Sequence, residues 1–171
     1  RESWKIPCLQ SSTEQPSFYW VYQQPVQVVP CTSHAYDIAN LPRISVVVPT
    51  YRRPATTIKR TLDALMAQSY PHDAFEIMLI DDGSPKNEAE EAVRQLGWPP
   101  NVHYFKTSHG GAASARNQGI QLSHGEIVAF TDDDCAPESN WLQEIAAVFL
   151  RHPIGGTGGL TLPTVNENAI V

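Results

Sequence analysis

The chain has 171 residues, of which 42% are hydrophobic and 18% charged, a composition typical of a globular domain with a sizeable core. This excludes a disordered or fibrous protein. The formal net charge of −6, with no basic cluster larger than the pair Arg52-Arg53, argues against a broad nucleic-acid-binding surface.

The cysteines and the hydropathy of the chain exclude further classes of protein. The three cysteines are widely spaced and odd in number, which fits neither a disulfide framework nor a zinc motif and favours a reducing compartment. No apolar run reaches the roughly 18 residues that a membrane span requires. The chain begins with Arg1 rather than Met and has no recognisable ending at Val171, so we expect a piece of a longer protein, truncated at the C-terminus.

Residues 1–42 differ in character from the rest of the chain. They contain five prolines, many Gln and Ser residues and an aromatic run at 18–22, without a sustained helical or alternating period. We therefore predict an irregular extension over 1–42 that has room for one short strand, followed by a folded domain over 43–171.

From residue 43 onward, apolar strands alternate with amphipathic helices. Strands are predicted over 44–49, 75–81, 102–106 and 126–131, and helices over 55–69, 86–96, 112–122 and 141–150. Residues 158–162 are predicted to open a fifth strand. Because helices of this length join successive strands, the pattern predicts an α/β fold with a mostly parallel sheet flanked by helices.

Polar residues cluster where the predicted strands end. The first strand runs into Thr50-Tyr51-Arg52-Arg53, the second into Asp81-Asp82-Gly83-Ser84 and the fourth into Thr131-Asp132-Asp133-Asp134. In an open α/β sheet, ligands bind beyond the carboxyl ends of the strands. These loops are therefore predicted to form one binding rim that carries hydroxyl groups, an aromatic ring, arginines and five aspartates.

The segment from Asp81 to Ser84 has two interpretations. Asp-Gly is a common turn pair, and an Asp or Ser there can cap the helix that follows. Alternatively, one of the two carboxylates accepts a hydrogen bond from a ligand's base N–H or hydroxyl group. Both interpretations stay open at this stage.

A run of small residues at 110–119 opens the third predicted helix. Small residues let a ligand approach the helix N-terminus, where negative charge is favoured, and Arg116 lies near enough to pair with a phosphate or an aspartate. The spacing matches neither GxGxxG nor the P-loop, which disfavours both motifs. His109 is interpreted as a solvated loop residue rather than a ligand or base, and Cys135 as a small buried residue rather than a nucleophile.

The aspartate triplet at 132–134 ends the fourth predicted strand. If the strand stays extended, Asp132 and Asp134 point one way and Asp133 the other, which gives a D-x-D pair. Two neighbouring carboxylates suit a hard divalent cation, and Mg2+ usually takes only one or two protein carboxylates, with water and phosphates as its other ligands. The alternative is an acidic cap for a helix beginning near Glu138, and both roles are compatible.

Four ordered motifs resemble those of family 2 glycosyltransferases with the Rossmann-like GT-A fold. They are VVVPTYRRP at 46–54, LIDDGS at 79–84, ARNQGI at 115–120 and FTDDDCAP at 130–137. The resemblance covers residues 43 to 165 and none of the first 40. It implies a nucleotide-diphosphate-sugar donor, often UDP-linked, and inverting transfer of the sugar to an acceptor hydroxyl.

The resemblance also implies roles for individual residues. Thr50 and Tyr51 would border the base, Asp82 would accept from the base's ring N–H, and Arg116 would lie near the base or the diphosphate. Asp132 would face the ribose or sugar, and Asp134 would coordinate Mg2+ or Mn2+. The nucleotide-sugar-binding residues expected on this basis are Thr50, Tyr51, Arg53, Asp82, Arg116, Asp132 and Asp133, with Asp132 and Asp134 as metal ligands.

One part of the family pattern is missing. The family's catalytic base belongs to a later acidic motif that does not occur before Val171, so the chain resembles the donor-binding half of a metal-dependent enzyme. The alternatives are a non-catalytic nucleotide-sugar-binding module and a sugar nucleotidyltransferase, which is disfavoured because the loop after the first strand is not Gly-rich. The expected acceptor is a carbohydrate, lipid or protein, and the expected location is cytoplasmic, with membrane association through segments outside this chain left open.

Overall fold

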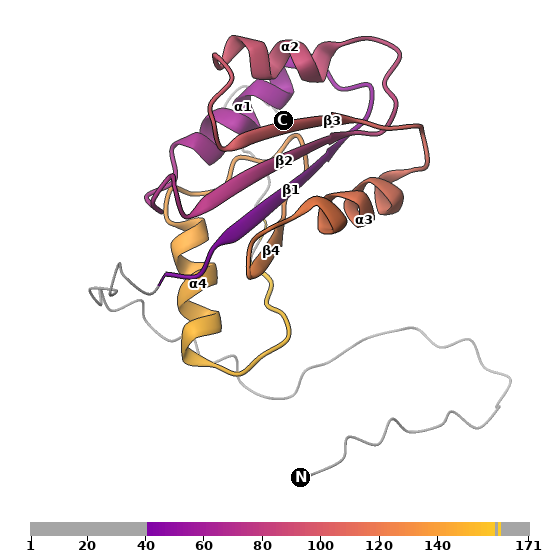
Figure 1. Cartoon of the computed structure of the whole chain (residues 1–171). Helices are drawn as coiled ribbons and strands as arrows, with labels where there is room; N and C mark the ends of the chain where they lie inside the picture. The colour runs from indigo at the N-terminus through magenta and orange to yellow at the C-terminus, as the bar shows by residue number, and fades with distance from the viewer. Residues whose placement is uncertain (1–40, 160, 162–171) are drawn as a thin grey trace, which may run out of the picture. The chain divides into compact units, whose positions relative to one another are not determined.

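The computed structural model of the chain describes residues 41–159 and residue 161. Its sheet consists of β1 (Ile44–Thr50), β2 (Phe75–Asp81), β3 (Val102–Lys106) and β4 (Ile127–Phe130). The strands are parallel and lie in the order β3-β2-β1-β4 (Figure 1). In the register, Ile44 lies opposite Phe75 on one side and Ile127 on the other. The predicted α/β fold with a mostly parallel sheet is confirmed.

Helices cover both faces of this sheet. They are α1 (Ala55–Met66), α2 (Glu88–Gln95), α3 (Ala112–Leu122) and α4 (Trp141–Arg151). Buried residues of α1, α2 and α4 share one apolar core, whereas α3 packs on the opposite face, as Figure 1 shows for α1 and α2 against α3. Because both faces are covered, β1 and β2 are buried at every position, which explains why their sequences are mostly apolar.

A close approach brings α3 onto β1. Gly119 of α3 lies directly against Val47, and a Cβ atom at that glycine would collide with the valine side chain. Ala115, one turn earlier, is fully buried in the same small core. Small residues on this side of α3 therefore let the helix pack closely on the sheet. This packing places the first turns of α3, which include Arg116, beside the carboxyl ends of the strands.

Several element boundaries differ from the sequence-based prediction by one to three residues. The first helix ends at Met66 rather than 69, because Gln68 and Ser69 bond instead to the segment before α4: the Gln68 side chain donates to the Glu138 carbonyl at 2.7 Å and the Ser69 amide to the Ser139 carbonyl at 2.7 Å. The second helix begins at Glu88, and the fourth strand spans only Ile127–Phe130. Residues 158, 159 and 161 form no strand, and the other two residues of the expected fifth strand lie outside the described residues.

Some predictions fall largely outside the described part of the chain. The extension expected over 1–42 is described only at residues 41 and 42, so it stays a prediction. Within residues 41–159, no helix has the length and apolar character needed to cross a membrane. The cytoplasmic location expected from the sequence also stays a prediction.

Candidate functional site

A cleft of about 320 Å³ opens at the carboxyl ends of the strands. Every binding or metal residue predicted from the sequence lines it, from loops that follow β1, β2 and β4 and from the first turns of α3. The lining residues are Pro49, Thr50, Tyr51, Arg53, Asp82, His109, Gly111, Ala112, Ala115, Arg116, Asp132, Asp133 and Asp134. The structure therefore brings together the loops at the carboxyl ends of the strands that the sequence singled out, and their role in ligand binding stays a prediction.

Asp82, directly after β2, is a buried carboxylate on the wall of this cleft. Its Oδ1 accepts a hydrogen bond from the Gly110 amide at 2.8 Å, and its Oδ2 accepts one from the Gly111 amide at 2.8 Å. The His109 imidazole Nδ1 lies 2.8 Å from the same Oδ2. Burial by itself raises the pKa of Asp82, but the two amides and His109 outweigh it and lower the pKa below its ordinary value. The group is therefore held as an anion.

The two aspartates of the Asp81-Asp82 pair have different surroundings. Asp81 is fully buried; its Oδ1 accepts from the Ser84 amide at 2.8 Å and its Oδ2 from the Tyr104 hydroxyl at 3.1 Å. Gly83 makes the turn possible, because its φ of 76° suits glycine and a Cβ there would lie 2.8 Å from the His109 amide nitrogen. Asp81 therefore stabilises the turn, but neither it nor Ser84 caps the helix that follows, because the N-cap residue of α2 is Asn87. Asp82 lines the cleft, and its hydrogen bond to a ligand stays a prediction.

An aromatic stack stands beside Asp82. The rings of Tyr51 and His109 lie 4.3 Å apart between centroids at an interplanar angle of 19°, and the Arg52 guanidinium lies 4.9 Å from the Tyr51 centroid. Arg52 has a φ of 51°, and its amide donates to the Ser84 hydroxyl at 2.9 Å. Sequence reasoning missed the position of His109, whose side chain lines the cleft although 56% of it is exposed. Its place immediately before the glycines was the available signal.

The aspartate triplet does not continue the fourth strand as expected, although its members divide as predicted, with Asp132 and Asp134 exposed and Asp133 buried. β4 ends at Phe130, and the chain turns at the triplet, so all three carboxylates line the same cleft. Asp133 is the buried member: its carboxylate accepts from the Thr50 hydroxyl at 2.7 Å and from Arg53 Nε at 2.9 Å. The Thr61 hydroxyl of α1 donates to the Asp133 carbonyl at 2.9 Å. Asp133 therefore joins the loops after β1 and β4.

Asp132 and Asp134 are the exposed members of the triplet, with side-chain exposures of 59% and 46%. Arg116 pairs with Asp132 at 2.6 Å, and Arg53 pairs with Asp134 at 3.2 Å. Two accessible carboxylates in one cleft fit a hard cation that takes its other ligands from water and phosphate. Within residues 41–159, no group of three or more His, Cys, Asp or Glu side chains has a metal-binding arrangement.

Two expectations about the region after the triplet are corrected. The triplet is not a helix cap, because α4 begins at Trp141 and its N-cap residue is Asn140. Cys135 is only partly buried, with its Sγ 4.0 Å from Asp134 Oδ1. The acidic residues therefore belong to the loop rather than to the helix terminus.

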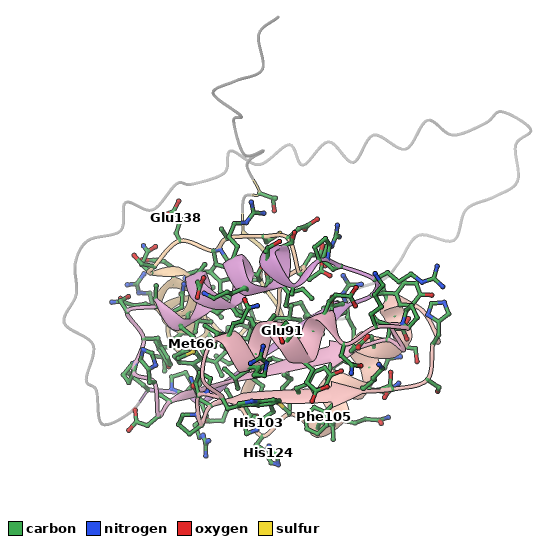
Figure 2. The ribbon with its side chains drawn as sticks, turned by 90° about the horizontal axis from the view of Figure 1, so that it is seen from above. Met66, Glu91, His103, Phe105, His124 and Glu138 are labelled. Carbon is green, nitrogen blue, oxygen red and sulfur yellow. The ribbon has the colours of Figure 1, made fainter. Side chains whose placement is uncertain are left out.

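A second buried carboxylate lies at the amino end of β2. Glu76 Oε1 accepts from the Ser45 hydroxyl at 2.6 Å and from the His124 amide at 2.7 Å. The imidazoles of His103 and His124, which lie near one another in Figure 2, approach Glu76 Oε2 at 3.7 and 3.4 Å. Burial raises the pKa of Glu76, but the hydrogen bonds from Ser45 and His124 outweigh it and lower the pKa. No sequence pattern indicated this cluster.

The parallel sheet with helices on both faces, and with a charged cleft at the carboxyl ends of its strands, defines a Rossmann-like α/β domain. A family model described as Glycosyl transferase family 2 matches residues 45–167. The chain belongs to glycosyl transferase family 2, and its fold is the GT-A fold. The sugar nucleotidyltransferase alternative is therefore not supported.

Individual relatives agree with this assignment. The chain is 34% identical over 122 residues to "Glycosyltransferase AglE" of Haloferax volcanii, a match that covers 70% of this chain and 38% of the relative. It is similar to the "Mannosyltransferase PcManGT from Pyrobaculum calidifontis in complex with GDP-Man and Mn2+" (30% identity, TM-score 0.56, 69% of this chain and 33% of that one). It is also similar to S. aureus TarS 1-349 in complex with UDP-GlcNAc (25% identity, TM-score 0.58, 70% and 37%). The chain thus spans well under half the length of these relatives.

Proposed function

We propose that this domain binds a nucleotide-diphosphate sugar, in the first instance a UDP-sugar, together with Mg2+ or Mn2+. The protein to which it belongs then transfers the sugar with inversion to an acceptor hydroxyl. The observation that carries the proposal is the buried Asp82 carboxylate, which lines the same cleft as the Tyr51 ring, two arginines and two exposed aspartates. The complexes of PcManGT with GDP-Man and Mn2+ and of TarS with UDP-GlcNAc support a donor of this class.

The Asp82 side of the cleft suits the base of the nucleotide. A carboxylate that stays ionised accepts a hydrogen bond from a ring N–H, and uracil and guanine both carry such a group. Tyr51 offers a flat face for stacking, and its side chain is 36% exposed. Thr50 is buried and already donates to Asp133, so it borders the base pocket as part of the wall.

The arginines and the exposed aspartates suit the diphosphate and the metal. Asp132 and Asp134 would hold the cation, which when bound supplies Lewis-acid charge at the departing diphosphate. Arg116 and Arg53 now pair with these two carboxylates, and a diphosphate offers both guanidinium groups an alternative anion. Asp133 keeps the Arg53 side chain in the cleft through its bond to Nε at 2.9 Å.

The acceptor side of the reaction needs a separate carboxylate base. We assign no such base among residues 41–159, because the aspartates of the cleft already bond to protein groups on the side that we propose for the nucleotide sugar. The resemblance of the motifs to family 2 enzymes assigns the base to a later acidic motif. The acceptor, whether carbohydrate, lipid or protein, is therefore left to the full-length protein.

Calorimetric titration of the chain with UDP-glucose and GDP-mannose, with and without Mn2+, tests the proposal. We expect binding of one donor that Mn2+ strengthens, a loss of that Mn2+ effect in Asp134→Asn, and weaker binding by about tenfold or more in Asp82→Asn with or without metal. Asp63→Asn is the matched control, because Asp63 pairs with Lys59 on α1 and does not line the cleft. Failure of both donors to bind, or binding that neither cleft substitution weakens, would overturn the proposal.

A further inference from the structure

We propose that His109 competes with the donor's base for its binding place, so that the base enters only when the imidazole turns away. The inference rests on the proposed function, because it takes Asp82 and Tyr51 as the partners of the base. His109 makes the two contacts that the proposal gives to a nucleobase. Its ring stacks on Tyr51 with centroids 4.3 Å apart, and its Nδ1 lies 2.8 Å from Asp82 Oδ2.

The burial of Asp82 makes this a competition rather than an addition. Oδ2 accepts from the Gly111 amide and lies against His109 Nδ1, which uses the two lone-pair directions of that oxygen. Oδ1 accepts from the Gly110 amide and keeps a second lone-pair direction. Only 3% of the Asp82 side chain is exposed, however, so a ring N–H of the base reaches the carboxylate only from the place that the imidazole occupies.

The stacking face of Tyr51 points to the same conclusion. The imidazole lies almost parallel to the phenol ring, at 19°, in the arrangement that a stacked base would adopt. The Arg52 guanidinium also lies over the Tyr51 ring, 4.9 Å from its centroid. Tyr51 therefore already has partners for stacking, and a base gains this contact by replacing one of them.

The imidazole is free to leave without disturbing its backbone. The His109 side chain is 56% exposed, and its polar contacts in residues 41–159 are to the carboxylate and carbonyl of Asp82. The loop itself is held by other bonds: the Thr107 amide donates to the Asp81 carbonyl at 2.9 Å, and the Gly110 amide donates to Asp82. A change of side-chain rotamer is therefore sufficient to open the base position.

Binding of uridine, guanosine, UDP and GDP to the chain and to His109→Ala tests the proposal. A protein whose binding-competent form is only partly populated binds with an affinity reduced by that fraction, so His109→Ala should tighten binding of the matching nucleoside by about three- to tenfold. His109→Gln, which keeps a planar donor but loses the aromatic ring, should lie between the two. His152→Ala, an exposed histidine at the end of α4, is the matched control and should bind as the wild type does.

The outcomes separate this inference from the proposed function. If none of the four compounds binds to either protein, the proposed function fails and the inference with it. If they bind and His109→Ala binds equally or more weakly, the proposed function stands and the competition is overturned, since a supporting ring would lower affinity when removed. Proton NMR gives a second readout. On addition of UDP, the His109 ring signals should move toward those of a solvated histidine, and unmoved signals during binding would overturn the competition.

Discussion

The two ends of β2 carry two buried carboxylates that resemble one another closely in their contacts. Glu76, at the amino end, accepts from a hydroxyl and a backbone amide; Asp82, just past the carboxyl end, accepts from two backbone amides. Each has an imidazole within 3.4 Å, from His124 and His109 respectively. The pKa of each is lower than its ordinary value.

The difference between them lies in what surrounds the cluster. Asp82 lines a cleft that it shares with an aromatic ring and arginines, whereas Glu76 is not part of that cleft and ties Ser45 of β1 to the turn before β4. A perturbed pKa and a nearby histidine thus mark structural ion clusters as readily as ligand sites. Position at the carboxyl ends of the strands, together with a cavity, distinguishes the two.

The largest expected effect is on nucleotide affinity, which should fall when Asp82 is removed but not when Glu76 is removed. Asp82→Ala should weaken binding of the matching nucleoside diphosphate by about 10- to 100-fold, because a hydrogen bond to a charged group is lost. Glu76→Ala should leave that affinity unchanged. Both should lower the free energy of unfolding by about 1–3 kcal/mol, because buried amide or hydroxyl donors lose their acceptor.

Calorimetry and urea denaturation of both variants measure these quantities. If Glu76→Ala stays folded yet binds nucleotide as poorly as Asp82→Ala does, that result would contradict a purely structural role for Glu76 at the amino end of β2. Equal affinities of wild type and Asp82→Ala would remove the carboxylate from the base pocket. Comparison with Asp63→Asn, on the exposed side of α1, corrects for a general loss of negative charge.

Much of the fold could be predicted from the sequence, because strands that are buried on both faces of the sheet appear as short apolar runs. The apolar runs at 44–49 and 75–81 correspond to β1 and β2 within one residue, since parallel strands covered on both sides need no polar positions. The end of the first helix was predicted three residues too late. Its last predicted turn gives way to bonds between Gln68, Ser69 and the segment before α4, and such contacts between distant segments leave no local signal.

The candidate site, like the fold, could be predicted only in part. The loops could be predicted, because topology alone decides that the carboxyl ends of parallel strands meet at one edge. The contacts within it could not. The bond of Asp133 to Thr50 and the stacking of His109 on Tyr51 join residues 83 and 58 positions apart, respectively. Asp132 and Asp134 differ from Asp133 in burial as alternation predicted, but β4 ends at Phe130, so this division comes from the turn and from the bonds of Asp133 rather than from an extended strand.

A smaller effect is expected from two glycines that lie at opposite ends of the sheet. A Cβ at Gly83 would lie 2.8 Å from the His109 amide nitrogen, and a Cβ at Gly125 would lie 2.5 Å from the Ser45 amide nitrogen. Both alanine substitutions should therefore lower the free energy of unfolding, by about 1–3 kcal/mol. Only Gly83→Ala should also weaken nucleotide binding, because it displaces the loop whose amides hold Asp82.

Urea denaturation and nucleotide titration of the two glycine variants make this comparison. Gly83 has a φ of 76°, so Gly83→Ala carries a backbone cost that Gly125→Ala lacks and should be the less stable of the two. Gly97→Ala is a useful control, since Gly97 has the same φ of 76° but no atom within 4 Å of its added Cβ. A loss of nucleotide affinity in Gly125→Ala equal to that in Gly83→Ala would show that the two ends are coupled.

The smallest effect is the acid dependence of stability. For Glu76 and Asp82 the folded pKa lies below the ordinary values of 4.5 and 3.8, so each group contributes stability that is present above that ordinary value and is lost as the pH falls through the folded pKa. Glu76→Gln should therefore be less stable than the wild type at pH 7 and approach it in acid, with a flatter dependence of the urea midpoint on pH. Asp82→Asn should show the same convergence as the pH falls below the ordinary value of 3.8 for that group. Glu91 on α2, whose side chain is 36% exposed, is the control. Its hydrogen bond from the exposed Arg94 also lowers its pKa, but solvent screens the pair, so Glu91→Gln should follow the wild-type curve. If Glu91→Gln flattened the curve as much as Glu76→Gln, burial would not be the source of the acid sensitivity.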